Sequence, residues 1–190
     1  MKISILLPYK ENYSPTYPGA VSIFVNSMNK LSIFKDSIIV FGSTDFKKKL
    51  SNNYVNINLS KKILSSQSKQ YVQKFYDIQS KSNADIIEIH NRPNYINKLT
   101  KLNSKLVLYF HNDPVTMIGS KTVNDRINLL NVCSKIIFNS EWSKKQYLKD
   151  LKNFYHKSKK LEVIHQSTAK TKINLKKKEK LITFVGKLNS

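Results

Sequence analysis

The chain has 190 residues, 33 of them Lys or Arg and 12 Asp or Glu, which gives a formal net charge of +21. A hydrophobic fraction of 40% suffices for a globular core, and no apolar run reaches the roughly 18 to 20 residues that cross a bilayer. Its single cysteine, Cys133, excludes an intramolecular disulfide and agrees with a reducing compartment. We therefore expect one soluble domain with a short extension.

The excess of positive charge comes almost entirely from lysine. Only Arg92 and Arg126 carry the guanidinium fork that suits phosphates and guanines, so we expect no nucleic-acid partner. Two alternatives stay open for a cluster of seven lysines, attraction to an anionic membrane surface or a solvated helix face. The cluster consists of Lys144, Lys145, Lys149, Lys152, Lys157, Lys159 and Lys160.

Short apolar runs along the chain predict strands. The run at the N-terminus is more typical of a first strand than of a signal peptide. The predicted strands are residues 3–7, 37–41, 54–57, 85–89, 106–110, 135–138 and 161–164. We expect a cytoplasmic location, with peripheral contact at the inner membrane face as one alternative.

Longer amphipathic segments between these runs predict helices at residues 20–34, 67–82, 94–102, 122–132 and 141–151. The first has an apolar stripe of Val21, Phe24, Val25, Met28 and Leu31, which we expect to be buried. This alternation predicts an α/β fold, a Rossmann-like parallel sheet with helices on both faces.

The domain organisation follows from a change of pattern near the C-terminus. Residues 1–167 read as one domain, and residues 168–180, rich in Lys, Thr and Asn, read as a linker. Strand character returns in residues 181–190, which we interpret as the first strand of a second domain that is absent here. An unpaired strand exposes its backbone groups, so it favours a homodimer through this segment.

Ligands of open parallel sheets bind at the carboxyl ends of the strands, so the residues after each strand are candidates for a site. After the first strand, Gly19 begins a helix, where backbone N–H groups would attract a phosphate, although a turn glycine has the same appearance. After a later strand, His90 and Arg92 could clamp a phosphate or a sugar hydroxyl.

A histidine next to acidic and amide groups follows the strand at 106–110. His111, with Asn112 and Asp113, could act as a general base or bind a substrate hydroxyl, or simply cap the next turn. After the strand at 135–138, Asn139 and Ser140 could face the cleft, and Ser140 is also a candidate N-cap.

Two further expectations concern packing and metals. We expect Trp142 to be a packing anchor rather than a platform for a sugar ring. The histidines are scattered, and neither an H-x-x-x-H nor a C-x-x-C pair is present, so we expect no metal site.

In this order, the segments resemble the amino-terminal domain of the GT-B glycosyltransferases, specifically the large retaining family 4. The segments that carry the resemblance are the Pro18-Gly19 loop, Phe110-His111-Asn112-Asp113-Pro114, the run from Ile136 to Lys145, Val163-Ile164-His165, and Phe184-Val185-Gly186-Lys187-Leu188. The last is similar to the V-G-R-L that opens the second domain of that family.

The resemblance implies transfer of a sugar from a nucleotide-sugar donor to a glycan or lipid-linked acceptor, with no metal and no further cofactor. By position, Gly19 would contact the donor phosphates and His111 would be the catalytic residue at the transferred sugar. The implied acceptor-binding residues are His90, Arg92, Asn112, Asp113, Asn139 and Ser140.

The carboxylates that hold the nucleotide sugar in this family belong to the second domain, in an E-x7-E motif. We therefore expect this chain to be inactive alone, as a cut piece, a truncated gene product or one part of a split enzyme. Two other classes stay open: a non-enzymatic module that binds a glycan, a lipid or a partner protein, and a basic protein that binds charged surfaces.

Overall fold

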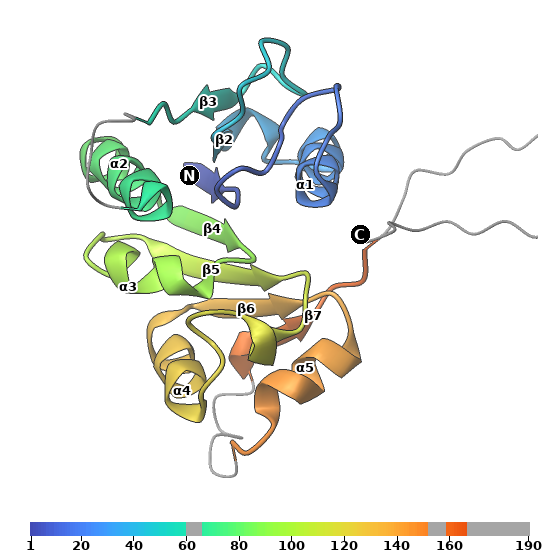
Figure 1. Cartoon of the computed structure of the whole chain (residues 1–190), viewed down its shortest axis with the longest axis vertical. Coiled ribbons are helices and arrows are strands. Elements are labelled where there is room, and N and C mark those ends of the chain that lie inside the picture. Colours follow the sequence, from blue (N-terminus) through green and yellow to red (C-terminus); the bar gives the residue numbers. More distant parts are fainter. Residues whose placement is uncertain (60–65, 152–158, 167–190) are drawn as a thin grey trace, which may run out of the picture.

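Seven parallel strands form one sheet in the computed structural model, which describes residues 1–59, 66–151 and 159–166 (Figure 1). Their order across the sheet is β3-β2-β1-β4-β5-β6-β7. The strands are β1 (Ile3–Leu6), β2 (Ile38–Gly42), β3 (Tyr54–Asn56), β4 (Ile86–His90), β5 (Lys105–Phe110), β6 (Lys135–Phe138) and β7 (Leu161–Val163). Each predicted strand is confirmed, with ends that differ by at most one residue.

Helices cover both faces of the sheet, as predicted, but very unevenly. The described helices are α1 (Ala20–Leu31), α2 (Gln67–Ser82), α3 (Ile96–Leu99), α4 (Val123–Val132) and α5 (Glu141–Leu148), with short 3₁₀ turns η1 (Lys35–Ser37), η2 (Pro93–Tyr95) and η3 (Pro114–Thr116). The larger apolar core contains residues of α2, α3, α4 and α5, whereas the smaller one joins α1 to β1 and β2.

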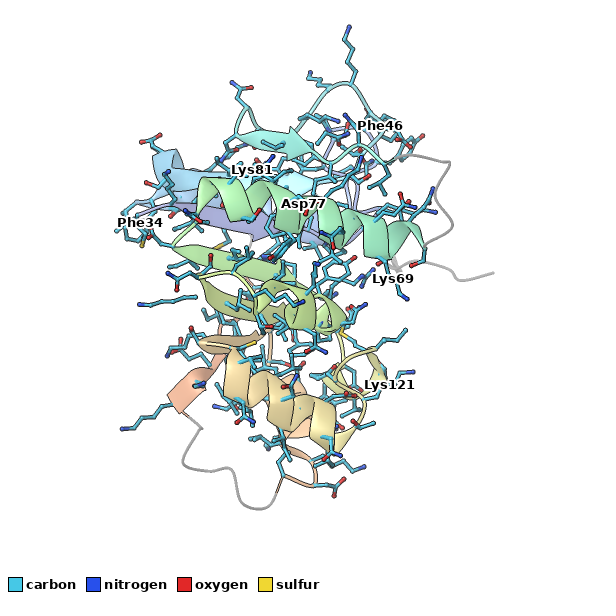
Figure 2. The ribbon with its side chains drawn as sticks, turned by 90° about the vertical axis from the view of Figure 1, so that its left-hand side faces the viewer. Phe34, Phe46, Lys69, Asp77, Lys81 and Lys121 are labelled. Atoms are coloured by element: carbon cyan, nitrogen blue, oxygen red, sulfur yellow. The ribbon has the colours of Figure 1, made fainter. Side chains whose placement is uncertain are left out.

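The alternation of side chains along each strand explains these two cores. Leu106, Leu108 and Phe110 of β5 point to the large core, and Figure 2 shows α2 and α4 lying in front of the strands on that side. Val107, between them, belongs to neither core and is only half-buried. The face of β4 to β7 opposite the large core is therefore thinly covered within the described residues.

The predicted apolar stripe of α1 is correct only in its first half. Val21 and Val25 are buried, but Leu31 is 82% exposed and Met28 is also exposed. The rest of the buried side consists of the polar residues Ser22, Asn26 and Asn29. Small polar side chains fill this interface. The apolar periodicity therefore predicted where the helix lies in the sequence but not which of its faces is buried.

Three helices are clearly shorter than predicted, and one of them is α1, which ends at Leu31 instead of at residue 34. In the segment 94–102, α3 covers only Ile96–Leu99 after the turn η2, because Pro93 starts a 3₁₀ turn there. α5 ends at Leu148, two residues before Asp150 takes a left-handed backbone conformation with φ of 66°.

The predicted linker at 168–180 and strand at 181–190 lie outside the described residues, and so does the dimer contact expected of that strand. None of the helices that the structure describes combines the length and the apolar character needed to cross a membrane.

Candidate functional site

A cavity of about 370 Å³ lies at the carboxyl edge of the sheet, where the segments after β1, β4, β5 and β7 meet the start of α1. This is the edge at which parallel sheets bind ligands. The cavity is lined by Pro8, Glu11, Ala20, Val21, Asn91, Arg92, His111, Asn112 and Gln166.

His111 lies at the centre of a line of polar contacts. Its Nδ1 is 2.6 Å from Nε2 of Gln166, and its Nε2 is 2.8 Å from Nδ1 of His90. His90 is fully buried, and its own Nε2 lies 2.6 Å from Oε1 of Glu88, a close contact that is not in line for a hydrogen bond. Burial, assisted by the neighbouring His90, lowers the pKa of His111 to about 3, so its ring is neutral at neutral pH.

Aromatic rings hold the two imidazoles in place. Tyr109 stacks on His111 with ring centroids 4.5 Å apart and on His90 with centroids 5.4 Å apart. Phe24 of α1 packs edge-on against Tyr109 and His111. These contacts hold the imidazole of His111, which presents Nδ1 towards Gln166.

Amide side chains fix the backbone at His111. Asn91 adopts a left-handed conformation with φ of 54°, and its Oδ1 accepts hydrogen bonds from the backbone N–H groups of His111 and Asn112, at 3.0 and 3.3 Å. Asn139 donates from Nδ2 to the carbonyl oxygen of His111 at 2.8 Å. Ser143 in turn donates to Oδ1 of Asn139 at 2.8 Å.

A carboxylate occupies the N-terminus of α1, where Gly19 was predicted to meet a phosphate. Oε1 of Glu11 accepts a hydrogen bond from the backbone N–H of Ser22 at 3.1 Å, and Gly19 itself provides no side-chain cap. A Cβ at Gly19 would overlap that carboxylate, which is the end of a flexible side chain and could move aside. A phosphate at this helix terminus would likewise have to displace the carboxylate.

Of the predicted site residues, His111, Arg92 and Asn112 line the cavity, and Gly19 immediately precedes the lining residue Ala20. His90 does not line it, because its ring is buried beside that of His111. Arg92 donates from Nη1 to the carbonyl oxygen of Asn91 at 2.8 Å.

The remaining predicted residues contribute to the structure of the surrounding loops. Asp113 caps η3 by accepting from the N–H of Val115, and Ser140 is the N-cap of α5, as predicted, accepting from the N–H of Ser143. Asn139 supports the backbone of His111, as described above. These three do not line the cavity.

Sequence reasoning missed Glu11, Glu88, Asn91 and Gln166. Asn91 had a usable signal, since asparagine tolerates the left-handed conformation better than most residues. Glu11 and Gln166 lie in segments without a local pattern, and only the fold brings them to His111.

The structure also corrects the role predicted for Trp142 and removes one lysine from the predicted surface cluster. Trp142 is 55% exposed and is not a packing anchor, because α5 packs instead through Ser143 and Tyr147. Within the lysine cluster, Lys160 donates to the carbonyl oxygens of Leu130 and Cys133, each at 2.9 Å, so it is not available to a surface partner. Among the described residues, no group of three or more His, Cys, Asp or Glu could hold a metal ion.

The fold is shared with solved structures of longer proteins. The chain is similar to HepE of Anabaena, solved in complex with UDP, at 15% sequence identity and a TM-score of 0.58 over 88% of this chain and 44% of HepE. HepE in complex with UDP-glucose gives the same TM-score at 13% identity, again over 88% and 44% of the two chains. A glycosyltransferase from Rickettsia africae is similar at 16% identity and a TM-score of 0.56, over 86% of this chain and 42% of that protein.

The chain thus spans less than half of these proteins, and the likeness shows a common α/β, Rossmann-like fold. No protein-family model and no curated protein matches the sequence.

Proposed function

We propose that this chain is the acceptor-binding front domain of a GT-B glycosyltransferase of the retaining family 4 type. Joined to a second, donor-binding domain, it would transfer a sugar from a nucleotide sugar to a glycan or lipid-linked acceptor without a metal ion. The observation that carries the proposal is the cavity around neutral His111 at the carboxyl edge of the sheet. The fold that it shares with a protein solved in complex with UDP-glucose supports the same assignment.

The cavity offers what a hydroxyl-rich ligand needs. His111 supplies a ring nitrogen that can accept a hydrogen bond, and Arg92 and Asn112 supply donors along the same wall. We expect His111 to orient the reacting hydroxyl, while the leaving phosphate takes up its proton. Positioning and charge stabilisation then lower the barrier, with no protein nucleophile required.

The donor phosphates would approach Gly19 at the start of α1, as the resemblance implies. In that arrangement Glu11 must leave the helix N-terminus, because a carboxylate and a phosphate compete for the same N–H groups. Glu11 is therefore a barrier to donor binding in the conformation described here.

A titration of the ¹⁵N-labelled chain tests the acceptor site. We expect short oligosaccharides to shift the backbone amide signals of Asn91, Arg92, His111 and Asn112, and His111→Asn to weaken binding about tenfold, the loss of one well-placed hydrogen bond to a ligand. The control His165→Asn changes an exposed histidine that does not line the cavity. Shifts spread over the lysine-rich surface instead of this cavity would contradict the proposal.

One observation favours a second candidate, a glycan-binding module that takes no nucleotide. Glu11 already satisfies the α1 terminus and places a negative charge where a donor phosphate would lie. The variant Glu11→Gln keeps an oxygen that can accept a hydrogen bond but removes the charge. For the transferase, measured on the chain joined to its donor-binding domain, we expect it to tighten binding of UDP-glucose about fivefold, corresponding to roughly 1 kcal/mol of repulsion. For the module it would have no effect on UDP-glucose.

A further inference from the structure

Glu88 and His90 are an acid and a base on one strand that the proposed reaction does not yet use. They lie two residues apart on β4, so both side chains point to the thinly covered face of the sheet, and the His90 ring is fully buried. With His111 and Gln166 they form a continuous line whose three contacts measure 2.6, 2.8 and 2.6 Å.

The carboxylate at one end determines where the protons lie. Oε1 of Glu88 is 2.6 Å from Nε2 of His90, a distance at which two lone pairs would repel, so Nε2 carries a proton. Nδ1 of His90 faces Nε2 of His111, so only one of these two nitrogens carries the proton between them. With Nε2 of His90 already protonated, a proton on its Nδ1 would make that ring a cation, so the arrangement with two neutral rings has the shared proton on Nε2 of His111 and leaves Nδ1 of His111 with a free lone pair.

The other end of the line agrees with this assignment. Nδ1 of His111 faces the amide nitrogen of Gln166, which can only donate. Gln166 is exposed and lines the same cavity as His111, so a ligand hydroxyl can take the place of its amide. Tyr109 stacks on the His111 ring and Phe24 packs edge-on against it, so turning the ring over would disturb both contacts.

We propose that Glu88, acting through His90, is a positioning residue that keeps His111 in the tautomer whose Nδ1 accepts a hydrogen bond from a hydroxyl in the cavity. The identity of that hydroxyl, on a sugar or on its acceptor, rests on the proposed function; the tautomer does not. Burial also keeps the pKa of His111 low, so that the lone pair stays free at neutral pH.

The tautomer can be read directly from the ring nitrogens of the ¹⁵N-labelled chain by long-range ¹H–¹⁵N correlation. The chain has four histidines, and His111→Asn identifies the signals of His111. We expect Nε2 of His111 to be protonated and Nδ1 of His111 to be unprotonated at about pH 6 to 8, the range in which histidines usually titrate. A proton on Nδ1 of His111, with His90 protonated at both nitrogens, would overturn the proposal.

Three variants test the part played by Glu88. Glu88→Leu, at a position that borders an otherwise mainly apolar cavity, removes the carboxylate that faces Nε2 of His90, and we expect His111 to change from one tautomer to a mixture of both. Glu88→Gln keeps an oxygen that can face Nε2 of His90 at a similar short distance, and it should retain the single tautomer. Glu162→Leu removes the carboxylate that pairs with Lys135 on the neighbouring strand and serves as the matched control.

The outcomes separate this inference from the proposed function. A single tautomer in Glu88→Leu, with the fold shown intact by the backbone amide spectrum, would rule out the positioning role. If Glu88→Leu does not fold, the ring signals of the unchanged protein still decide the tautomer. If the tautomer depends on Glu88 while oligosaccharides do not bind, the proposed acceptor site fails and the positioning role stands.

Discussion

The low pKa of His111 makes the folded chain less stable in acid. Its pKa is about 3 in the folded chain, because burial and the neighbouring His90 disfavour the charged ring, against about 6.5 in an unfolded chain. Below pH 6.5 the unfolded state therefore binds a proton that the folded state does not. Folding stability must fall as the pH drops from about 6.5 towards 3.

The His111→Asn variant should remove this pH dependence. Between pH 7.5 and 5, we expect the free energy of unfolding to fall by about 2 kcal/mol more in the unchanged chain than in the variant. The reason is that pH 5 lies about 1.5 units below the unfolded pKa, and each unit contributes about 1.36 kcal/mol. Urea denaturation at each pH measures the difference. His165→Asn, which changes an exposed histidine, is the control. Equal losses in the His111 and His165 variants would show that His111 takes up its proton in the folded state.

At the scale of single elements, α1 depends on a residue outside the helix for its N-terminal cap. Gly19 has no side chain to offer and the first turn contains no acidic residue, so the carboxylate of Glu11 supplies both the hydrogen bond to Ser22 and the negative charge. This links the loop after β1 to the helix that covers the smaller core.

Glu11→Ala should therefore lower the free energy of unfolding by about 1 kcal/mol, the usual value of an N-cap, and Glu11→Gln by less because its oxygen can still accept. Urea denaturation at neutral pH compares the two. Glu141→Ala, an exposed acidic residue in the first turn of α5, where Ser140 is the cap, should cost only a few tenths. The cap is unimportant if Glu11→Ala costs no more than Glu141→Ala.

Elements were more predictable than the contacts between them. Consecutive apolar residues such as Leu106, Val107 and Leu108 predict a parallel strand whichever face is better covered, so the strands were found to within one residue. The rotation of α1 was not, because it buries Asn26 and Asn29 instead of Met28 and Leu31.

The same limit applies to the site. The ends of β4 and β5 placed Arg92 and His111 together, since parallel strands end at one edge. Which neighbours face the cavity depends on packing: His90 is buried beside His111. Glu11 and Gln166 come from segments far apart in the chain and carry no local pattern. Only the three-dimensional structure shows that both line the cavity next to His111.

Across the whole molecule, the two faces of the sheet should differ in their contribution to stability. Leu108 is fully buried in the large core, whereas its neighbour Val107 points to the thinly covered face and belongs to neither core. We expect Leu108→Ala to cost about 2 to 5 kcal/mol and Val107→Ala less than about 1 kcal/mol. Urea denaturation measures both. Comparable losses would mean that the second face is packed as tightly as the first.

The net charge of +21 acts on the whole fold, since the described residues contain few ion pairs to offset it. Self-repulsion among lysines favours the expanded, unfolded chain, and salt screens it over a Debye length that shrinks from about 10 Å at 0.1 M to about 3 Å at 1 M. We therefore expect the urea midpoint to rise when NaCl is increased from about 0.05 to 0.5 M. The double variant Lys47→Gln and Lys48→Gln, at two exposed positions, should show a smaller rise because less repulsion is left to screen. A midpoint that falls with salt would mean that the few attractive pairs outweigh the repulsion.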